Sequence, residues 1–101
     1  MKTAYLFPAL VAGTISLLAP AFAGSDLSER QIRELVRQGR ILPLERILER
    51  HREFGRLLDL EVEAEHGMII YELEMLGRDG RVRELEIDAA NGDILKQKIE
   101  R

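Results

Sequence analysis

The chain has 101 residues, no cysteine, and a formal net charge of −3 from 15 basic and 18 acidic side chains. The absence of cysteine excludes disulfides and a lipid anchor on an N-terminal cysteine. The net charge is mildly negative and the sequence contains no nucleic-acid-binding motif, so nucleic-acid binding is not expected. A chain of this size should form one small domain. Its stability should come from a modest core, from a partner or from dimerisation, so a homo-oligomer is one of the alternatives.

The first 23 residues have the pattern of a secretory signal peptide. Lys2 gives the start a positive charge, and an uncharged, mostly apolar run follows from Thr3 to Leu18. Ala21 and Ala23 then form a small-x-small cleavage site. The pattern therefore predicts export by the general secretory route.

We expect cleavage between Ala23 and Gly24, which leaves residues 24–101 as a 78-residue domain. The product would be periplasmic or secreted, without stable insertion in the membrane. An uncleaved membrane anchor is the alternative, since about 20 apolar residues can span a bilayer. Two prolines and a short apolar core in this segment argue against the anchor.

Two amphipathic helices are expected next. Ser28 is a good N-cap, and Gln31 completes a capping box three residues later. Gly39 fits the left-handed position that ends a helix. Pro43 suits the first turn of a second helix, which Gly55 would end. The apolar stripes consist of Ile32, Leu35 and Val36 in the first helix and of Leu44, Ile47, Leu48, His51 and Leu58 in the second.

From Leu57 the hydrophobic period changes to two, which is typical of half-buried strands. The short turns His66-Gly67, Asp79-Gly80 and Asn91-Gly92 divide this part of the chain, and Asp93–Ile99 can add a fourth strand. The apolar face would consist of Leu58, Leu60, Val62, Ala64, Ile69, Tyr71, Leu73, Met75, Leu85, Ile87 and Ala89. The predicted fold class is α+β: an antiparallel meander of three to four strands, with two N-terminal helices packed on one face.

The strand region resembles the PepSY domain. The matching pattern is a strand with Tyr71, a turn with Gly80, and a strand that ends in Asp88-Ala-x-x-Gly92-x-aliphatic. The helical lead QIRELVRQGRILPLERILE is similar to that of small exported PepSY proteins, which often occur beside two-component regulators. The resemblance implies an α+β binding module whose partner is a sensor histidine kinase or an exported peptidase. PepSY domains in propeptides of thermolysin-type peptidases restrain the enzyme, so inhibition of a peptidase is the alternative function.

The sequence predicts neither an enzyme nor a cofactor. In residues 24–101 the only serines are Ser25 and Ser28, threonine and cysteine are absent, and both lysines lie near the end of the chain. Nucleophilic catalysis needs such a residue beside an oriented base. His51 and His66 do not have the spacing of a zinc motif, so no metal site is predicted. His51 is interpreted as a boundary residue of the apolar stripe.

The second face of the strands is acidic. Its candidate partner-binding residues are Glu61, Glu63, Glu72, Glu74, Glu84 and Glu86, and the three predicted strands place no lysine or arginine among them. Carboxylates opposite carboxylates destabilise a sheet. Solubility and protection against aggregation are one explanation. The others are a basic protein partner or divalent cations. We favour the protein partner, because calcium sites are usually built on a curved loop, and keep a cation-responsive acidic protein as a further alternative.

Overall fold

The computed structural model describes residues 25–100, so the predicted signal peptide with Ala21, Ala23 and Gly24 lies outside the described residues. Its elements are β1 (Ser25–Asp26), α2 (Glu29–Arg37), α3 (Leu44–Arg50), the 3-10 helix η3 (Arg52–Phe54), β2 (Arg56–Glu65), β3 (Met68–Leu76), β4 (Val82–Asp88) and β5 (Ile94–Glu100). Within this range no helix is long and apolar enough to cross a membrane.

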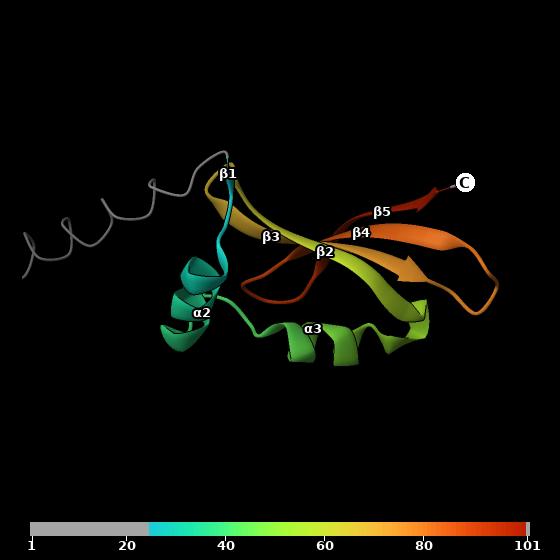
Figure 1. Cartoon of the computed structure of the whole chain (residues 1–101), viewed down its shortest axis with the longest axis horizontal. Coiled ribbons are helices and arrows are strands. Elements are labelled where there is room, and N and C mark those ends of the chain that lie inside the picture. The colour runs from blue at the N-terminus through green and yellow to red at the C-terminus, as the bar shows by residue number, and fades with distance from the viewer. Residues whose placement is uncertain (1–24, 101) are drawn as a thin grey trace, which may run out of the picture.

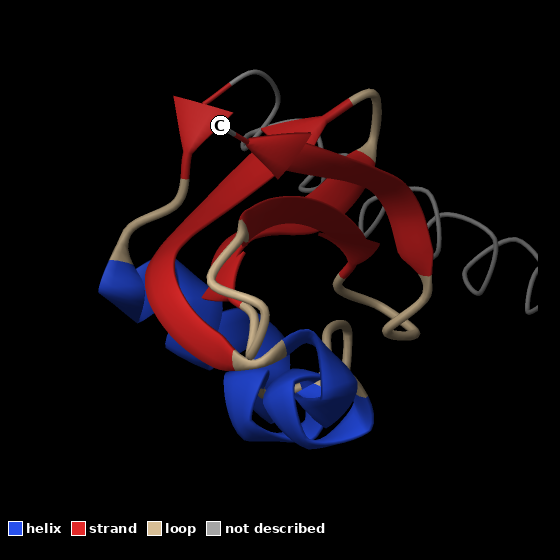
Figure 2. Ribbon diagram, turned by 90° about the vertical axis from the view of Figure 1, so that its right-hand side faces the viewer, coloured by secondary structure: helices blue, strands red, loops and turns tan. Residues whose placement is uncertain are grey.

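The strands form one antiparallel sheet in the order β1-β2-β3-β4-β5. Figure 1 shows the sheet above the two helices, and the side view in Figure 2 shows how it curves over them. The prediction of an α+β fold, with two helices on one face of a meander, is confirmed. The two-residue strand β1 was not predicted, because two residues are too short for an alternation pattern.

Both ends of α2 lie where the sequence predicts them. The Ser28 side chain accepts a hydrogen bond from the backbone nitrogen of Gln31 at 3.2 Å, and the Gln31 side chain accepts one from the Ser28 nitrogen at 2.8 Å. This capping box satisfies backbone donors that the first turn leaves unpaired. After the C-cap Gln38, Gly39 has a φ of 74°, a conformation that glycine adopts at little cost.

Gly55 ends the second helical segment and allows a close approach to the sheet. The α-helix α3 stops at Arg50, and a 3-10 turn continues to Phe54. Gly55 has a φ of 106°, and a Cβ atom here would lie 2.0 Å from the carbonyl oxygen of Leu76. A side chain at this position would therefore separate the start of β2 from the end of β3.

The core lies between the helices and the apolar face of the sheet. Its buried residues are Leu35, Ile41, Ile47, Val62, Tyr71, Leu73, Met75, Leu85, Ile87 and Ala89. The most deeply buried side chains come from the central strands β3 and β4, where Leu73, Leu85 and Ile87 are 0% exposed. The alternation predicted this face, whereas Ile41 lies in the connection between the helices and was not predicted.

Leu58 belongs to β2 and not to the apolar stripe of the second helix, and the inward position predicted for it in the sheet is also wrong. A β-bulge between Leu57 and Asp59 shifts the register of β2 against β3. Leu57 therefore packs against the core, while Leu58 is 44% exposed. A bulge adds one residue to a strand, so strict alternation cannot be extended across it.

Candidate functional site

The register of the sheet aligns the outward-facing acidic side chains in three rows across the strands. The first row consists of Asp59, Glu74 and Glu84, the second of Glu61, Glu72 and Glu86, and the third of Asp26, Glu63 and Asp88. We call these residues the acidic rows. All six glutamates predicted for the partner-binding face are among them. Directly opposed side chains in a sheet interact, so each row brings like charges together.

The third row differs from the other two at its centre. Ile70 alternates onto the outer face, where it lies between Glu63 and Asp88, but it is only 6% exposed. Beside it, carboxylate oxygens of Asp26, Glu61 and Glu63 lie within 4.8 Å of one another. Acidic groups on exposed surfaces often gather in this way without an ion, so the cluster alone does not define a metal site.

The β5 edge of this face carries two lysines, beyond the three strands for which the sequence predicted none. The register places Lys96 opposite Glu86 and Lys98 opposite Glu84. The Lys98 Nζ atom lies 3.8 Å from a carboxylate oxygen of Glu84. The sequence predicts no faces for the fourth strand, so both lysines were missed. The carboxylates of the acidic rows that have no lysine opposite them are therefore those on β2 and β3, away from β5.

The acidic rows perturb the protonation of their central members. Burial, followed by the charges of Glu63 and Glu84, raises the pKa of Glu72 to about 7. Burial, followed by the charge of Asp26, raises the pKa of Glu63. The charge of Glu100 is the largest cause of a raised pKa at Glu74. Near neutral pH, Glu72 is therefore partly protonated, and the charge of this face depends on pH.

The four positions of the family-like motif do not converge on a site. The Tyr71 hydroxyl points away from the acidic rows and donates to the carbonyl oxygen of Leu42 at 2.7 Å. Gly80 and Gly92 have φ values of 82° and 85°, as their turns require. The Asp88 side chain accepts a hydrogen bond from the Ala90 nitrogen at 3.0 Å, within the β4–β5 turn. These positions therefore support the fold.

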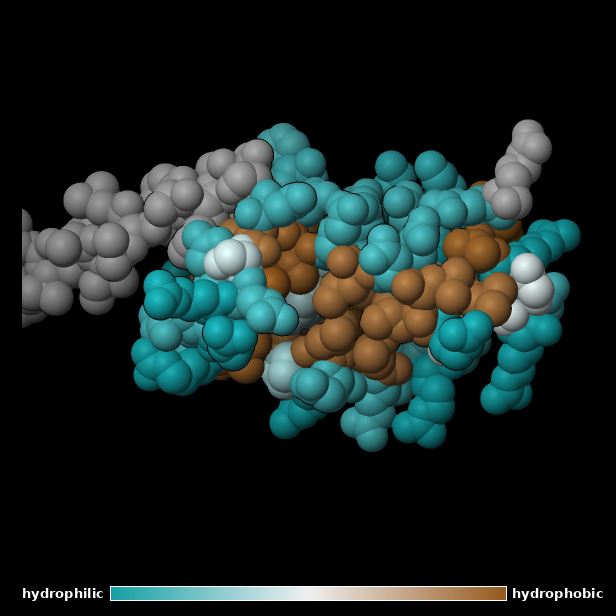
Figure 3. All heavy atoms as spheres, in the orientation of Figure 1, coloured by the Kyte–Doolittle hydropathy of each residue, from teal (hydrophilic) through white to brown (hydrophobic). Residues whose placement is uncertain are grey.

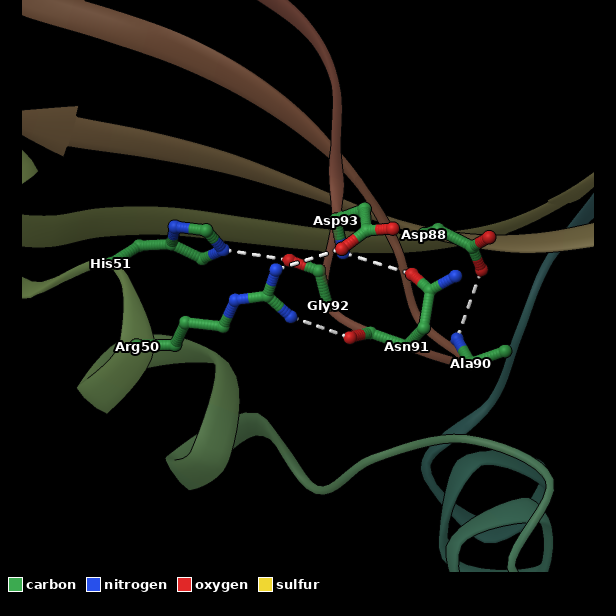
Figure 4. A network of polar contacts seen from close by, with 7 residues as sticks. All are labelled: Arg50, His51, Asp88, Ala90, Asn91, Gly92 and Asp93. Carbon is green, nitrogen blue, oxygen red and sulfur yellow. Dashed lines mark hydrogen bonds and ion pairs between the residues drawn. The ribbon is translucent and has the colours of Figure 1, made fainter.

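A polar network holds the β4–β5 turn against the end of α3 (Figure 4). The Arg50 guanidinium donates to the carbonyl oxygen of Asn91 at 2.6 Å and to the Asp93 carboxylate at 2.7 Å. His51 Nε2 lies 2.7 Å from the Gly92 carbonyl oxygen, which can only accept, so this nitrogen carries the proton. His51 is 5% exposed. The burial of His51 and its contact with Gly92 support the interpretation of His51 as a structural residue. The role of Arg50 was not predicted, because its partners lie about 40 residues away in the sequence.

On the opposite face, an apolar groove of about 720 Å³ lies between the helices and strands β2 and β3. Its apolar lining consists of Ile32, Val36, Pro43, Leu44, Leu60, Val62 and Tyr71. Figure 3 shows apolar side chains, in brown, at the surface between the sheet and the helices. The charged lining consists of Glu29, Arg30, Arg33, Glu34, Arg37 and Glu45. Three acidic and three basic residues balance, so the groove, unlike the acidic rows, does not select a ligand by charge.

Comparisons with protein-family models, with curated proteins and with solved structures found no match to this chain. The PepSY resemblance thus remains an expectation from the strand motif. Among the described residues, the acidic rows are the surface whose arrangement is least explained by the stability of the fold, since they oppose like charges.

Proposed function

We propose that this protein is an exported, non-catalytic PepSY-like module that binds a protein partner through the acidic rows and regulates it. The partner has a basic surface. The resemblance to small exported PepSY proteins favours the sensor domain of a membrane histidine kinase over other partners.

The observation that carries the proposal is the alignment of carboxylates in register across three strands. Glu61, Glu72 and Glu86 form one such row, and the raised pKa of Glu72 reflects its burial and this crowding. Solubility needs only dispersed charges on a surface, whereas aligned carboxylates oppose folding. A basic partner would neutralise the rows and gain affinity from the repulsion that it removes. Charges of this kind also accelerate association by steering.

Three observations support a role without catalysis. The Ser28 hydroxyl is engaged in the capping box of α2. Lys98 pairs with Glu84 on the outer face. The carboxylates of the acidic rows lie on the outside of the sheet and not in the apolar groove, where a substrate could be enclosed. The pKa of Glu72 is raised, but Glu72 does not line the groove, and catalytic groups with a shifted pKa are expected in a cleft.

The proposal is tested by capture followed by binding kinetics. The purified protein, immobilised and exposed to periplasmic extract, should retain a protein with a basic surface. Mass spectrometry then distinguishes a sensor kinase from an exported peptidase, which would make the protein an inhibitor. Calcium titration of the same immobilised protein tests the remaining alternative, a cation-responsive protein.

The role of the acidic rows is tested with two triple variants of equal charge change. One replaces Glu63, Glu74 and Glu86 by Gln, and the control replaces the exposed helical residues Glu29, Glu49 and Glu53 by Gln. Surface plasmon resonance against the captured partner is measured at two salt concentrations. We expect about tenfold slower association at low salt for the sheet variant only, with a flatter salt dependence. Equal association rates for the two variants would reject the acidic rows as the binding surface.

A further inference from the structure

Strand β5 is an edge of the sheet and exposes apolar side chains. It is the last strand in the sheet order, and within residues 25–100 only β4 pairs with it. Four large apolar side chains of this range are exposed, and three of them are on β5: Ile94 (36%), Leu95 (47%) and Ile99 (48%). Unpaired backbone groups along an edge strand form a template for another strand.

The regular part of β5 carries charges of opposite sign at equal distances from its middle residue. The register shifts between Ile94 and Lys96, which leaves Leu95 without a partner on β4. The regular part therefore runs from Lys96 to Glu100, with Lys98 at its middle. Lys96, Lys98 and Glu100 alternate onto the outer face, and Gln97 and Ile99 onto the inner face.

We propose that β5 is the interface of a symmetric dimer, in which the β5 strands of two copies pair antiparallel about Lys98. Lys96 then lies opposite Glu100 of the second copy, and Glu100 opposite Lys96 of the second copy. Gln97 lies opposite Ile99 of the second copy on the inner face. The two sheets become one continuous sheet of ten strands, and both β5 edges are covered.

The charges favour this register over pairing about Gln97, and its length favours it over pairing about Ile99, which would oppose Lys98 and Glu100 but pair only three of the described residues. Pairing about Gln97 would place Lys96 opposite Lys98 of the second copy twice and would include the bulge at Leu95. Pairing about Lys98 gives two Lys–Glu pairs and one Lys–Lys contact at the axis, where each Lys98 is already beside its own Glu84 at 3.8 Å. Opposite charges across strands stabilise a sheet, and like charges destabilise it.

A second copy also supplies a positive charge near Glu100 and Glu74, two carboxylates that repel each other in the single copy. Glu100 is the largest cause of the raised pKa of Glu74. Lys96 of the second copy would sit opposite Glu100 and offset this repulsion. A two-fold arrangement of this kind is closed, so it uses both edges without growing into a fibre. Self-association through β5 does not depend on the proposed partner.

The first test measures self-association of the purified protein by analytical ultracentrifugation over a range of concentrations. We expect a monomer–dimer equilibrium for the natural sequence. Lys96→Glu and Glu100→Lys should each weaken dimerisation about tenfold or more, because each variant replaces two attractive pairs by repulsive ones. A mixture of the two variants should dimerise again, since position 96 of each copy then faces an opposite charge at position 100 of the other. Circular dichroism checks that both variants fold.

The second test uses the absence of cysteine from the natural chain. Opposed residues of antiparallel strands have Cα atoms about 4.5–5.5 Å apart, a distance that a disulfide can bridge. Lys98→Cys should therefore form a covalent dimer on oxidation, whereas Arg78→Cys, in the exposed β3–β4 turn, should stay monomeric. A monomer at all concentrations, failure of the mixed variants to associate, or equal cross-linking of both cysteine variants would overturn the proposal.

Discussion

The hydroxyl of Tyr71 on β3 donates a hydrogen bond to the carbonyl oxygen of Leu42, which lies in the connection between the two helices, 2.7 Å away. The Tyr71 side chain is 1% exposed, and burial, followed by the charge of Glu45, raises its pKa to about 12. The Leu42 nitrogen in turn donates to the carbonyl oxygen of Ala89 at 2.8 Å. These two bonds fix the connection between α2 and α3 on the sheet.

Tyr71→Phe tests the importance of this anchor. The variant keeps the buried ring but leaves the Leu42 carbonyl oxygen without its donor. We expect a loss of about 1–2 kcal/mol in the free energy of unfolding, measured by urea denaturation. An unchanged midpoint would mean that water replaces the hydroxyl and that the anchor does not stabilise the fold.

Leu73→Ala and Leu58→Ala form a matched pair for the register of the sheet. Leu73 is 0% exposed at the centre of β3, whereas Leu58 at the bulge is 44% exposed. The first change should reduce the free energy of unfolding by roughly 2–5 kcal/mol, a large part of the stability of so small a domain. The second should change it by less than about 1 kcal/mol, because little apolar area is lost from the core. Thermal melting of both variants makes the comparison, and equal losses would contradict the bulge.

Gly92→Ala and Gly80→Ala separate a backbone effect from a contact. Both glycines have a positive φ, 85° and 82°, so each variant should lose about 1 kcal/mol from backbone strain. A Cβ atom at Gly92 would also lie 2.7 Å from Nη1 of Arg50, whereas nothing lies within 4 Å at Gly80. We therefore expect Gly92→Ala to be the more destabilising variant, by roughly 1 kcal/mol, because it displaces the guanidinium from Asn91. Chemical denaturation of the two variants decides this.

Glu72 should make the stability of the protein depend on pH. Its pKa rises from 4.5 to about 7 on folding, so the folded state binds more protons than the unfolded state between these two values. Stability is therefore expected to fall as the pH rises through this range. Glu72→Gln should stabilise the fold by about 1 kcal/mol at a pH near 8 and have little effect at a pH near 5. Melting temperatures at both pH values measure this, with Glu53→Gln, on the exposed side of η3, as the control.

The sequence predicts most of the features that depend on residues close together in the chain. The capping box at Ser28, the glycine positions at Gly39 and Gly55, and the inner face of β3 and β4 all follow from residue spacing within a few positions. The alignment of carboxylates also follows, since short turns fix the pairing of neighbouring strands and alternation fixes the faces. Opposed pairs such as Glu61 and Glu72 are the direct result.

Other features depend on contacts between distant segments, which the spacing of residues along the chain does not predict. The bulge that exposes Leu58 changes the parity of β2 by one residue, and no residue type in the strand requires it there. The contact of Arg50 with Asn91 joins segments 41 positions apart. The pairing of β1 with β2 joins Ser25 and Ala64, which lie 39 positions apart. Such long-range contacts arise from packing, which a single sequence does not reveal.

The order of elements along the chain also determines when the protein can fold. The apolar stripes of α2 and α3 come first in the sequence, but Leu73, Leu85 and Ile87, which they cover, lie in later strands. A helix this short is marginal in water until its apolar face is packed. The neighbouring strands β2 to β4 can pair as local hairpins at small loop-closure cost, and the helices then dock on them. In an exported protein, β4 must therefore cross the membrane before α2 and α3 have a surface to pack against.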